Sequence, residues 1–260
     1  MNHPASLLSG SPLRKSNWMI PIILTIVFAS QTKGFGPNAD EPAGVDLDCF
    51  VFLVTGKPTT GIAKEEIQQM QAAHIQNFDR LAKIQKLSAA GPCSDPDKKV
   101  RGIVVVHAPS LEKAQSLFDT DPYITQGFMT PEIHPYKPIA GRFVVPENEQ
   151  SLDKYTLVIL SKKADVDLQP EQDQRVLDGL ERFAKKQFEE GNLGFAGLFT
   201  KPANVTTKRL GVMVFRSGDI EFVKEKLKEL DPSIHDELQW QVFQQYMVKD
   251  AMPSHIESQK

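Results

Sequence analysis

The sequence predicts an α+β protein made of two tandem modules, each with the element order β-α-β-β-α-β. Apolar, β-branched segments typical of buried strands alternate with segments whose apolar residues recur at helical spacing. This order occurs twice, at a repeat spacing of about 110 residues, and a turn follows the second helix each time, at Asp121-Pro122 and at Asp231-Pro232. The alternative is one continuous α+β domain, in which the repeated order and both turns would be coincidental.

The first module begins with a strand over 48–54, where the sequence DCFVFLV is apolar, β-branched and aromatic. A helix over 63–88 is expected to follow, because its apolar residues fall on one stripe. Ser110 is a favourable N-cap, and Pro131 marks a bulge or an edge in the last strand. The other expected elements are a turn or short strand over 91–95, a strand over 102–108, a short helix over 111–118 and a strand over 127–136.

The second module repeats the series, and its last strand alternates polar and apolar residues with period two. The expected strands are 155–161, 194–200, 209–216 and 238–246, and the expected helices are 171–190 and 220–230. The chain is thereby divided into a signal peptide (1–30), a flexible leader (31–46), a first module (47–137), a linker with room for a short strand at 143–145 (138–153), a second module (154–248) and a tail (249–260).

Residues 1–30 have the pattern of a secretory signal peptide. Arg14 and Lys15 precede the apolar run WMIPIILTIVFA, and Val27 and Ala29 stand at suitable −3 and −1 positions before a polar stretch. The run is shorter than the roughly 20 apolar residues that span a bilayer. We therefore expect cleavage after Ala29 and an extracytoplasmic location, periplasmic or secreted. An uncleaved membrane anchor is the alternative.

The composition argues against some partners and sites. With 260 residues, 40% of them hydrophobic, the chain can bury one large core or two modest ones. A formal net charge of −3 argues against a nucleic-acid partner, which would need a basic face. The two cysteines, Cys49 and Cys93, do not form a CxxC pair, so the sequence gives no support to a zinc or thioredoxin-like site.

The first module resembles the YCII-related (YciI-like) family. The resemblance is carried by HIQNFDRLAKIQKLSAAGPCSD, GIVVVHAPSLEKAQSLFDTDPYITQGF and IHPY, which contain a His on the first helix, a Gly-Pro turn and an Asp-Pro-Tyr turn. It covers residues 48–137 well and residues 154–247 loosely. Members of this family are expected to be ferredoxin-like βαββαβ modules that pair into a dimeric α+β barrel.

This resemblance implies a four-stranded antiparallel sheet in each module, with two helices covering one face. One mixed sheet with parallel βαβ crossovers is the competing architecture. In the ferredoxin-like order a third strand separates Cys49 from Cys93, so their backbones should lie about two strand spacings apart, roughly 9–10 Å. A disulfide requires Cα atoms within about 7 Å, and we therefore expect both thiols to stay unpaired.

Carried over residue by residue, the resemblance implies a functional pair of His74 and Asp121. The residues themselves favour it, because His74 falls on the same helical stripe as Ile67, Met70 and Phe78 and should point toward the sheet. A buried imidazole needs a hydrogen-bond partner, and an acidic one would hold its tautomer and stabilise its cationic form. The alternatives are an ordinary core histidine and an Asp that only forms the turn.

Tyr123 and His134 are expected to line the same cleft as substrate-binding residues. No nucleophile motif, glycine-rich phosphate loop or cofactor fingerprint occurs in the sequence, so we expect no cofactor. A metal site from His74, His134 and Asp121 would have no spacing signature, and none is expected.

Two functions remain open. As an enzyme, the protein would use His74 as general acid or base on a small hydroxylated or carbonyl substrate, with Asp121 orienting it, in lyase- or hydrolase-type chemistry. The resemblance supports this function, because some relatives are dehydrochlorinase-type enzymes that act on hydroxylated aromatics. The alternative is a non-catalytic small-ligand-binding or structural module.

The second module is expected to be degenerate. Leu180 lies as far before Gly197 as His74 lies before Gly91, and Ser233 follows the second Asp-Pro turn where Tyr123 follows the first. Since the strands are too apolar for either sheet face to be left in water, we expect the modules to pack sheet against sheet as an intramolecular pseudo-dimer. The mature chain should then be a monomer that binds an unknown small molecule, with no nucleic acid and no membrane.

Overall fold

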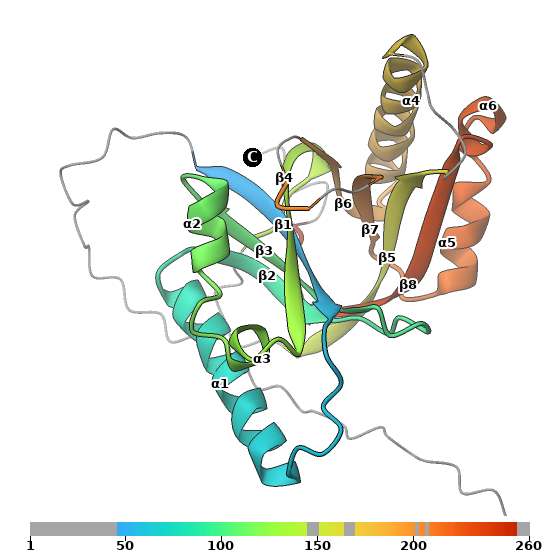
Figure 1. The fold of residues 1–260 in the computed structure, drawn as a ribbon. Helices are drawn as coiled ribbons and strands as arrows, with labels where there is room; N and C mark the ends of the chain where they lie inside the picture. Colours follow the sequence, from blue (N-terminus) through green and yellow to red (C-terminus); the bar gives the residue numbers. More distant parts are fainter. Residues whose placement is uncertain (1–45, 145–150, 164–169, 201–202, 206–207, 254–260) are drawn as a thin grey trace, which may run out of the picture.

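The computed structural model describes residues 46–144, 151–163, 170–200, 203–205 and 208–253 and has an α+β architecture (Figure 1). The strands are β1 (Leu47–Thr55), β2 (Leu87–Pro92), β3 (Val100–Ala108), β4 (Met129–Gly141), β5 (Leu152–Lys162), β6 (Leu193–Phe199), β7 (Arg209–Phe215) and β8 (Leu238–Val248). The helices are α1 (Lys64–Lys83), α2 (Leu111–Ser116), α3 (Pro122–Thr125), α4 (Pro170–Glu189), α5 (Ile220–Leu227) and α6 (Pro232–His235).

The strands form one sheet in the order β2-β3-β1-β4-β6-β7-β5-β8. Every strand pair in the described ranges is antiparallel, so the alternative with parallel crossovers is wrong. Strands β1 to β4 occupy one half of the sheet and strands β5 to β8 the other, and the pairing of β4 with β6 joins the two halves. The expected packing of sheet against sheet describes only part of this arrangement. The two halves are also joined edge to edge by the backbone hydrogen bonds between β4 and β6.

The two outer strands of the sheet, β2 and β8, meet each other. An antiparallel bridge links Cys93 to Gln245, and the Ser94 N–H donates to the Gln244 carbonyl at 2.9 Å. The buried Gln245 amide also donates to the Gly91 carbonyl at 3.0 Å. The eight-stranded sheet thus closes on itself as a barrel, and the contact with β2 covers part of the free edge of β8.

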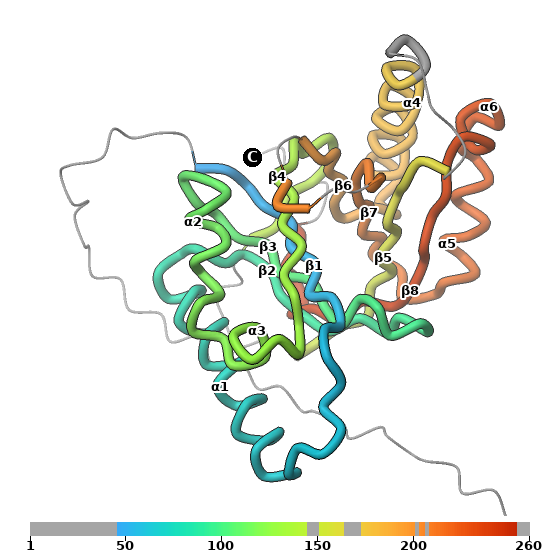
Figure 2. Tube along the Cα trace, viewed as in Figure 1, coloured from blue at the N-terminus to red at the C-terminus, as the bar shows by residue number. Residues whose placement is uncertain are grey.

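Both faces of the sheet are apolar because both are buried. Inside the barrel, side chains from the two halves form one cluster, which includes Phe50, Phe52, Ile103, Leu157, Phe195 and Phe243. Outside the barrel, a second cluster lies between α1 and β1 to β4, and a third lies between α4 and β5 to β8. Helices α1 to α3 cover one half of the sheet and α4 to α6 the other (Figures 1 and 2).

Helix α1 is shorter than the expected 63–88. Glu65 and Glu66 lie in its first turn and Lys83 in its last, as the helix dipole favours. The chain leaves the helix after Lys83, Gln85 adopts a positive φ of 55°, and β2 begins at Leu87. The sequence LSAAGP of β2 has little strand propensity, and its pairing with β3 overrides this preference.

Three further boundaries differ from expectation. Strand β4 extends to Gly141 and β5 begins at Leu152, so the expected linker over 138–153 is shorter. Pairing with β6 explains the extension, since it continues from Tyr136 to Gly141. The short strand expected at 143–145 is not present at 143–144, the part of it that the structure describes. Met252, which was expected to belong to the tail, is buried and packs inside the barrel.

The expected signal peptide and almost all of the leader fall on residues 1–45, outside the described residues, and so do residues 254–260 of the tail. Within the described ranges, no helix combines the length and the apolar character needed to cross a membrane.

Cys49 on β1 and Cys93 just after β2 are both free thiols. Strand β3 lies between β1 and β2, as the ferredoxin-like order implied for this half of the sheet. Burial raises the pKa of the Cys49 thiol to about 12, so this cysteine is held in the unreactive thiol form.

Candidate functional site

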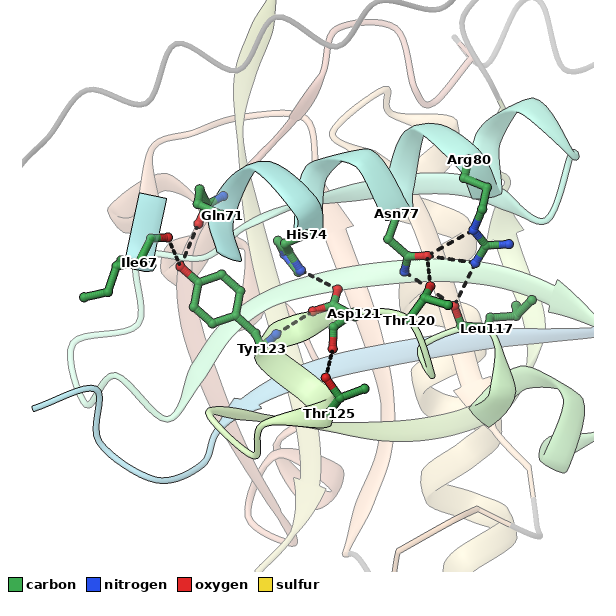
Figure 3. A network of polar contacts seen from close by, with 10 residues as sticks. All are labelled: Ile67, Gln71, His74, Asn77, Arg80, Leu117, Thr120, Asp121, Tyr123 and Thr125. Carbon is green, nitrogen blue, oxygen red and sulfur yellow. Dashed lines mark hydrogen bonds and ion pairs between the residues drawn. The ribbon is translucent and has the colours of Figure 1, made fainter. Parts of the chain in front are cut away.

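His74 and Asp121 form a direct pair between α1 and the N-terminus of α3 (Figure 3). The Nδ1 atom of His74 lies 2.5 Å from Oδ2 of Asp121, and both residues are buried, with exposed fractions of 7% and 0%. A carboxylate accepts, so Nδ1 donates and carries the hydrogen in this arrangement. The other ring nitrogen, Nε2, is then the one that can accept or deliver a proton.

Asp121 also forms the turn that it was expected to form. It is the N-cap of α3, and its Oδ1 atom accepts the Tyr123 N–H at 3.0 Å. Its carbonyl accepts the Thr125 hydroxyl at 3.0 Å. One carboxylate oxygen therefore holds the turn while the other holds the imidazole, and the Asp-Pro-Tyr sequence positions the second oxygen through the first.

Two aromatic rings fix the orientation of His74. The Phe78 ring, one turn along α1, lies edge-on with its centroid 4.4 Å from that of His74, and the Tyr123 ring lies edge-on at 5.5 Å. The Tyr123 hydroxyl is within reach of the Gln71 side-chain oxygen at 3.3 Å (Figure 3). Burial raises the pKa of Tyr123, so this residue acts as a neutral hydrogen-bond donor.

A second polar cluster ties α1 to the segment before Asp121. The Asn77 side-chain oxygen accepts hydrogen bonds from Arg80 at 2.7 Å and from the Thr120 hydroxyl at 3.0 Å. Arg80 also donates to the Leu117 carbonyl at 3.2 Å (Figure 3). These bonds lie next to the His74–Asp121 pair and hold its two supporting segments in register.

His74 lines a pocket of about 160 Å³ between α1 and the sheet. An engineered apolar cavity of about 150 Å³ is large enough to bind benzene, so this pocket suits a molecule of one-ring size. Tyr123 is not among the lining residues, but it contacts two of them, His74 through its ring and Gln71 through its hydroxyl. The lining residues are Leu53, Gln71, His74, Ile75, Phe78, Ala90, Gly91, Pro92, Arg101, Gly102, Ile103, Met129 and Leu152.

His134 does not share this pocket, contrary to expectation. It is fully buried on the other face of β4, inside the barrel, where it stacks on Phe199 with ring centroids 4.5 Å apart and lies edge-on to Phe52 at 5.5 Å. The neighbouring Ile133 packs in the cluster under α1 instead. Successive side chains of a strand point to opposite faces, and this separates His134 from the face that carries His74.

His134 should make the protein less stable in acid. Burial, together with the positive charge of Arg209, lowers the pKa of His134 from 6.5 to about 4, and its ring nitrogens have no hydrogen-bond partner among the described residues. Between pH 6.5 and 4 the unfolded chain binds the proton and the folded chain does not, so stability rises with pH in this window. We expect acidification from pH 7 to pH 4 to cost about 3 kcal/mol through this residue.

Urea unfolding at several pH values measures this effect. In the variant His134→Phe, which keeps an aromatic ring against Phe199, the part of the pH dependence between 6.5 and 4 should be reduced by about that amount. Equal pH dependence in both proteins would contradict this expectation.

The second half has no imidazole at the corresponding place. Counting from the first residue of each helix, Leu180 takes the place on α4 that His74 takes on α1, and it is fully buried in the apolar cluster under α4. Asp231 caps α6 as Asp121 caps α3, but it is exposed and its Oδ1 atom accepts both the backbone N–H and the hydroxyl of Ser233.

Two features were not expected from the sequence: Arg101 as a pocket residue and a second His–Asp pair. His107 Nδ1 lies 2.6 Å from Asp48 Oδ1 on the adjacent strands β3 and β1, and both side chains are partly exposed. A charge inside the apolar strand sequence VRGIVVV was the available signal for Arg101. Within the described part of the chain, no group of three or more His, Cys, Asp or Glu side chains could hold a metal ion.

Comparison with solved structures finds distant likenesses. A mutant chlorite dismutase from Candidatus Nitrospira defluvii has 11% sequence identity and a TM-score of 0.49, with 79% of this chain and 92% of that chain covered. A heme-binding protein from Thermus thermophilus has 12% identity and a TM-score of 0.46, with 80% and 93% covered. These likenesses carry no argument about ligand or reaction. No curated protein matches the chain.

The family comparison concerns the half that holds the His–Asp pair. The family model of the YCII-related domain matches residues 49–137, from β1 into β4. This range contains both His74 and Asp121, together with the residues that support them. The resemblance seen in the sequence is therefore confirmed for residues 49–137, as a match to the YCII-related domain.

Proposed function

We propose that the protein is an exported, cofactor-free enzyme that transfers protons on a small molecule, with His74 as general acid and base. One observation carries this proposal: the imidazole is held by Asp121 through Nδ1 at 2.5 Å and lines a pocket of one-ring size. The fixed tautomer leaves Nε2 as the proton acceptor, and the carboxylate stabilises the imidazolium that forms.

An elimination illustrates the chemistry. Nε2 of His74 takes a proton from a carbon of the substrate, the electrons of that C–H bond form a double bond, and the leaving group departs with its bonding pair. The imidazolium then returns the proton to the leaving group or to solvent, so atoms and charges balance. Asp121 remains ionised throughout and compensates the positive charge of the ring.

The second half, in this proposal, is a degenerate copy of a ferredoxin-like YCII-related module. It has the same sequence of strands and major helices, but it has Leu180 in place of the histidine. Its role is to close the barrel and cover the interior face of the first half, so the chain works as a monomeric pseudo-dimer. Linking the halves in one chain raises their effective concentration, which allows the second half to lose chemistry and keep its surface.

The proposal is tested by proton exchange in D2O and by release of the leaving group. The purified protein is incubated with one-ring hydroxylated and carbonyl compounds, including chlorinated hydroquinones, and followed by NMR and chloride release. We expect His74→Gln to lower the rate at least 100-fold, as is typical for loss of a general base. Gln can still donate to Asp121, so the buried carboxylate keeps a partner.

Two further variants test the role of the Asp121 charge and control for the loss of an imidazole elsewhere. Asp121→Asn keeps an N-cap for α3 but removes the charge, and we expect at least a tenfold loss of rate. His134→Phe removes an imidazole outside the pocket and should leave the rate unchanged. Equal rates in the wild type and in His74→Gln would exclude the enzyme. Ligand-induced thermal stabilisation without turnover would favour the alternative, a small-ligand-binding module.

A further inference from the structure

Arg101 is the cationic residue that lines the His74 pocket. It is exposed on β3, while its neighbours Val100 and Gly102 are buried. No hydrogen bond or ion pair holds its guanidinium within the described ranges. A guanidinium presents its donors in a planar fork that matches a carboxylate, and without a carboxylate partner in the protein it is available to an anion from outside.

An irregularity in the sheet explains how Arg101 reaches the pocket. On β1, Leu53 pairs with Gly102 and Val54 pairs with Val100, so Arg101 has no partner residue in this register. An extra residue of this kind bends the strand and re-aims its side chains, and such bulges are frequent next to active sites. Regular alternation along β3 would have turned Arg101 away from the face that carries His74.

The positive charge of Arg101 acts on Tyr123, which lies on the His74 side of the sheet. Although burial raises the pKa of Tyr123, the positive charge of Arg101 acts in the opposite direction and lowers it. Since the Tyr123 ring lies edge-on to His74, the guanidinium is close enough to act within the same site.

We infer that Arg101 anchors a carboxylate on the substrate, so that the pocket takes a one-ring acid with its ring against Leu53 and Phe78 and its carboxylate at the pocket mouth. The inference rests on the proposed function for the role of His74. A carboxylate matches the planar guanidinium with two parallel hydrogen bonds. The apolar lining then holds the ring, and Gln71 is the other polar residue, besides His74, whose side chain could hydrogen-bond to the ligand.

The test compares benzoate with benzamide, which has nearly the same shape and no charge. In titration calorimetry of the full mature chain at low salt, we expect benzoate to bind at least tenfold more tightly than benzamide. The variant Arg101→Gln should lose about tenfold in affinity for benzoate and little for benzamide, and Arg101→Lys should recover part of the loss. Added salt should weaken benzoate binding to the wild type, because the site is at the pocket mouth.

Arg142→Gln is the matched control, since it removes an exposed arginine outside the pocket and should leave benzoate binding unchanged. Equal unfolding midpoints for all variants show that they are folded. Failure of benzoate to bind the wild type, equal binding of benzamide, or unchanged affinity in Arg101→Gln would each overturn the inference. Because binding needs no turnover, this result is independent of whether His74→Gln loses catalysis.

Discussion

Residues 46–142 produced without the second half are expected to be insoluble or to form homodimers. Their interior face would expose Phe50, Phe52, Ile103 and Val105, all of which are fully or almost fully buried in the whole chain. Each such side chain contributes about 1.5–3 kcal/mol by its burial. Strands β2 and β4 would also lose their partners β8 and β6, which leaves two sheet edges open.

Size-exclusion chromatography with light scattering decides between these states. The control is the chain from residue 30 to 260, which should elute as a monomer because both halves of the barrel are present. A soluble, monomeric and cooperatively folding fragment 46–142 would show that the first half does not need the second, and it would contradict the pseudo-dimer.

Replacement of Gly91 by alanine is expected to lower the free energy of unfolding by about 3 kcal/mol, at the upper end of overpacking effects. A Cβ atom at this position would lie 1.7 Å from the carbonyl oxygen of Tyr246 on β8. Because this neighbour is backbone, the clash can be relieved only if β8 moves away from β2. Such a movement would also strain the bond from Gln245 to the Gly91 carbonyl.

Urea unfolding monitored by circular dichroism measures this loss. Gly61→Ala is the control: no atom lies within 4 Å of its added Cβ, and only its positive φ of 87° makes it unfavourable, at a cost of about 1 kcal/mol. An equal effect of the two substitutions would contradict the close packing of Gly91 against the Tyr246 carbonyl of β8.

The sequence was sufficient for the α+β class and for most elements, because these depend on local patterns. Strands such as DCFVFLV and RLGVMVF have no competing helical periodicity, and the α1 stripe from Met70 to Leu81 has no strand alternation. The start of β2 was misplaced, because LSAAGP carries no such pattern: residues 87–88 were expected in the helix and a turn or short strand was expected only at 91–95, and pairing with β3 makes 87–92 a strand.

For the candidate site, the sequence was sufficient where position on a helix decided the outcome. His74 lies on the buried stripe of α1, and the Asp-Pro turn places Asp121 at an N-cap, so their contact follows from local geometry and the order of elements. The catalytic role of the pair stays a prediction. The position of His134 could not be predicted because both faces of β4 are buried, and alternation alone does not tell which face lies under the helices.

The sequence by itself thus determined which segments become helices and strands, apart from β2 and the one-turn helices α3 and α6, and which helix face carries His74. Only the tertiary structure decided that β4 pairs with β6, that β8 meets β2 at Gly91, and that a bulge brings Arg101 to the His74 pocket. The physical reason is that periodicity acts between residues a few positions apart. Strand partners, sheet closure and bulges depend on contacts between residues far apart in the chain, whose register is chosen when both faces of the barrel are packed.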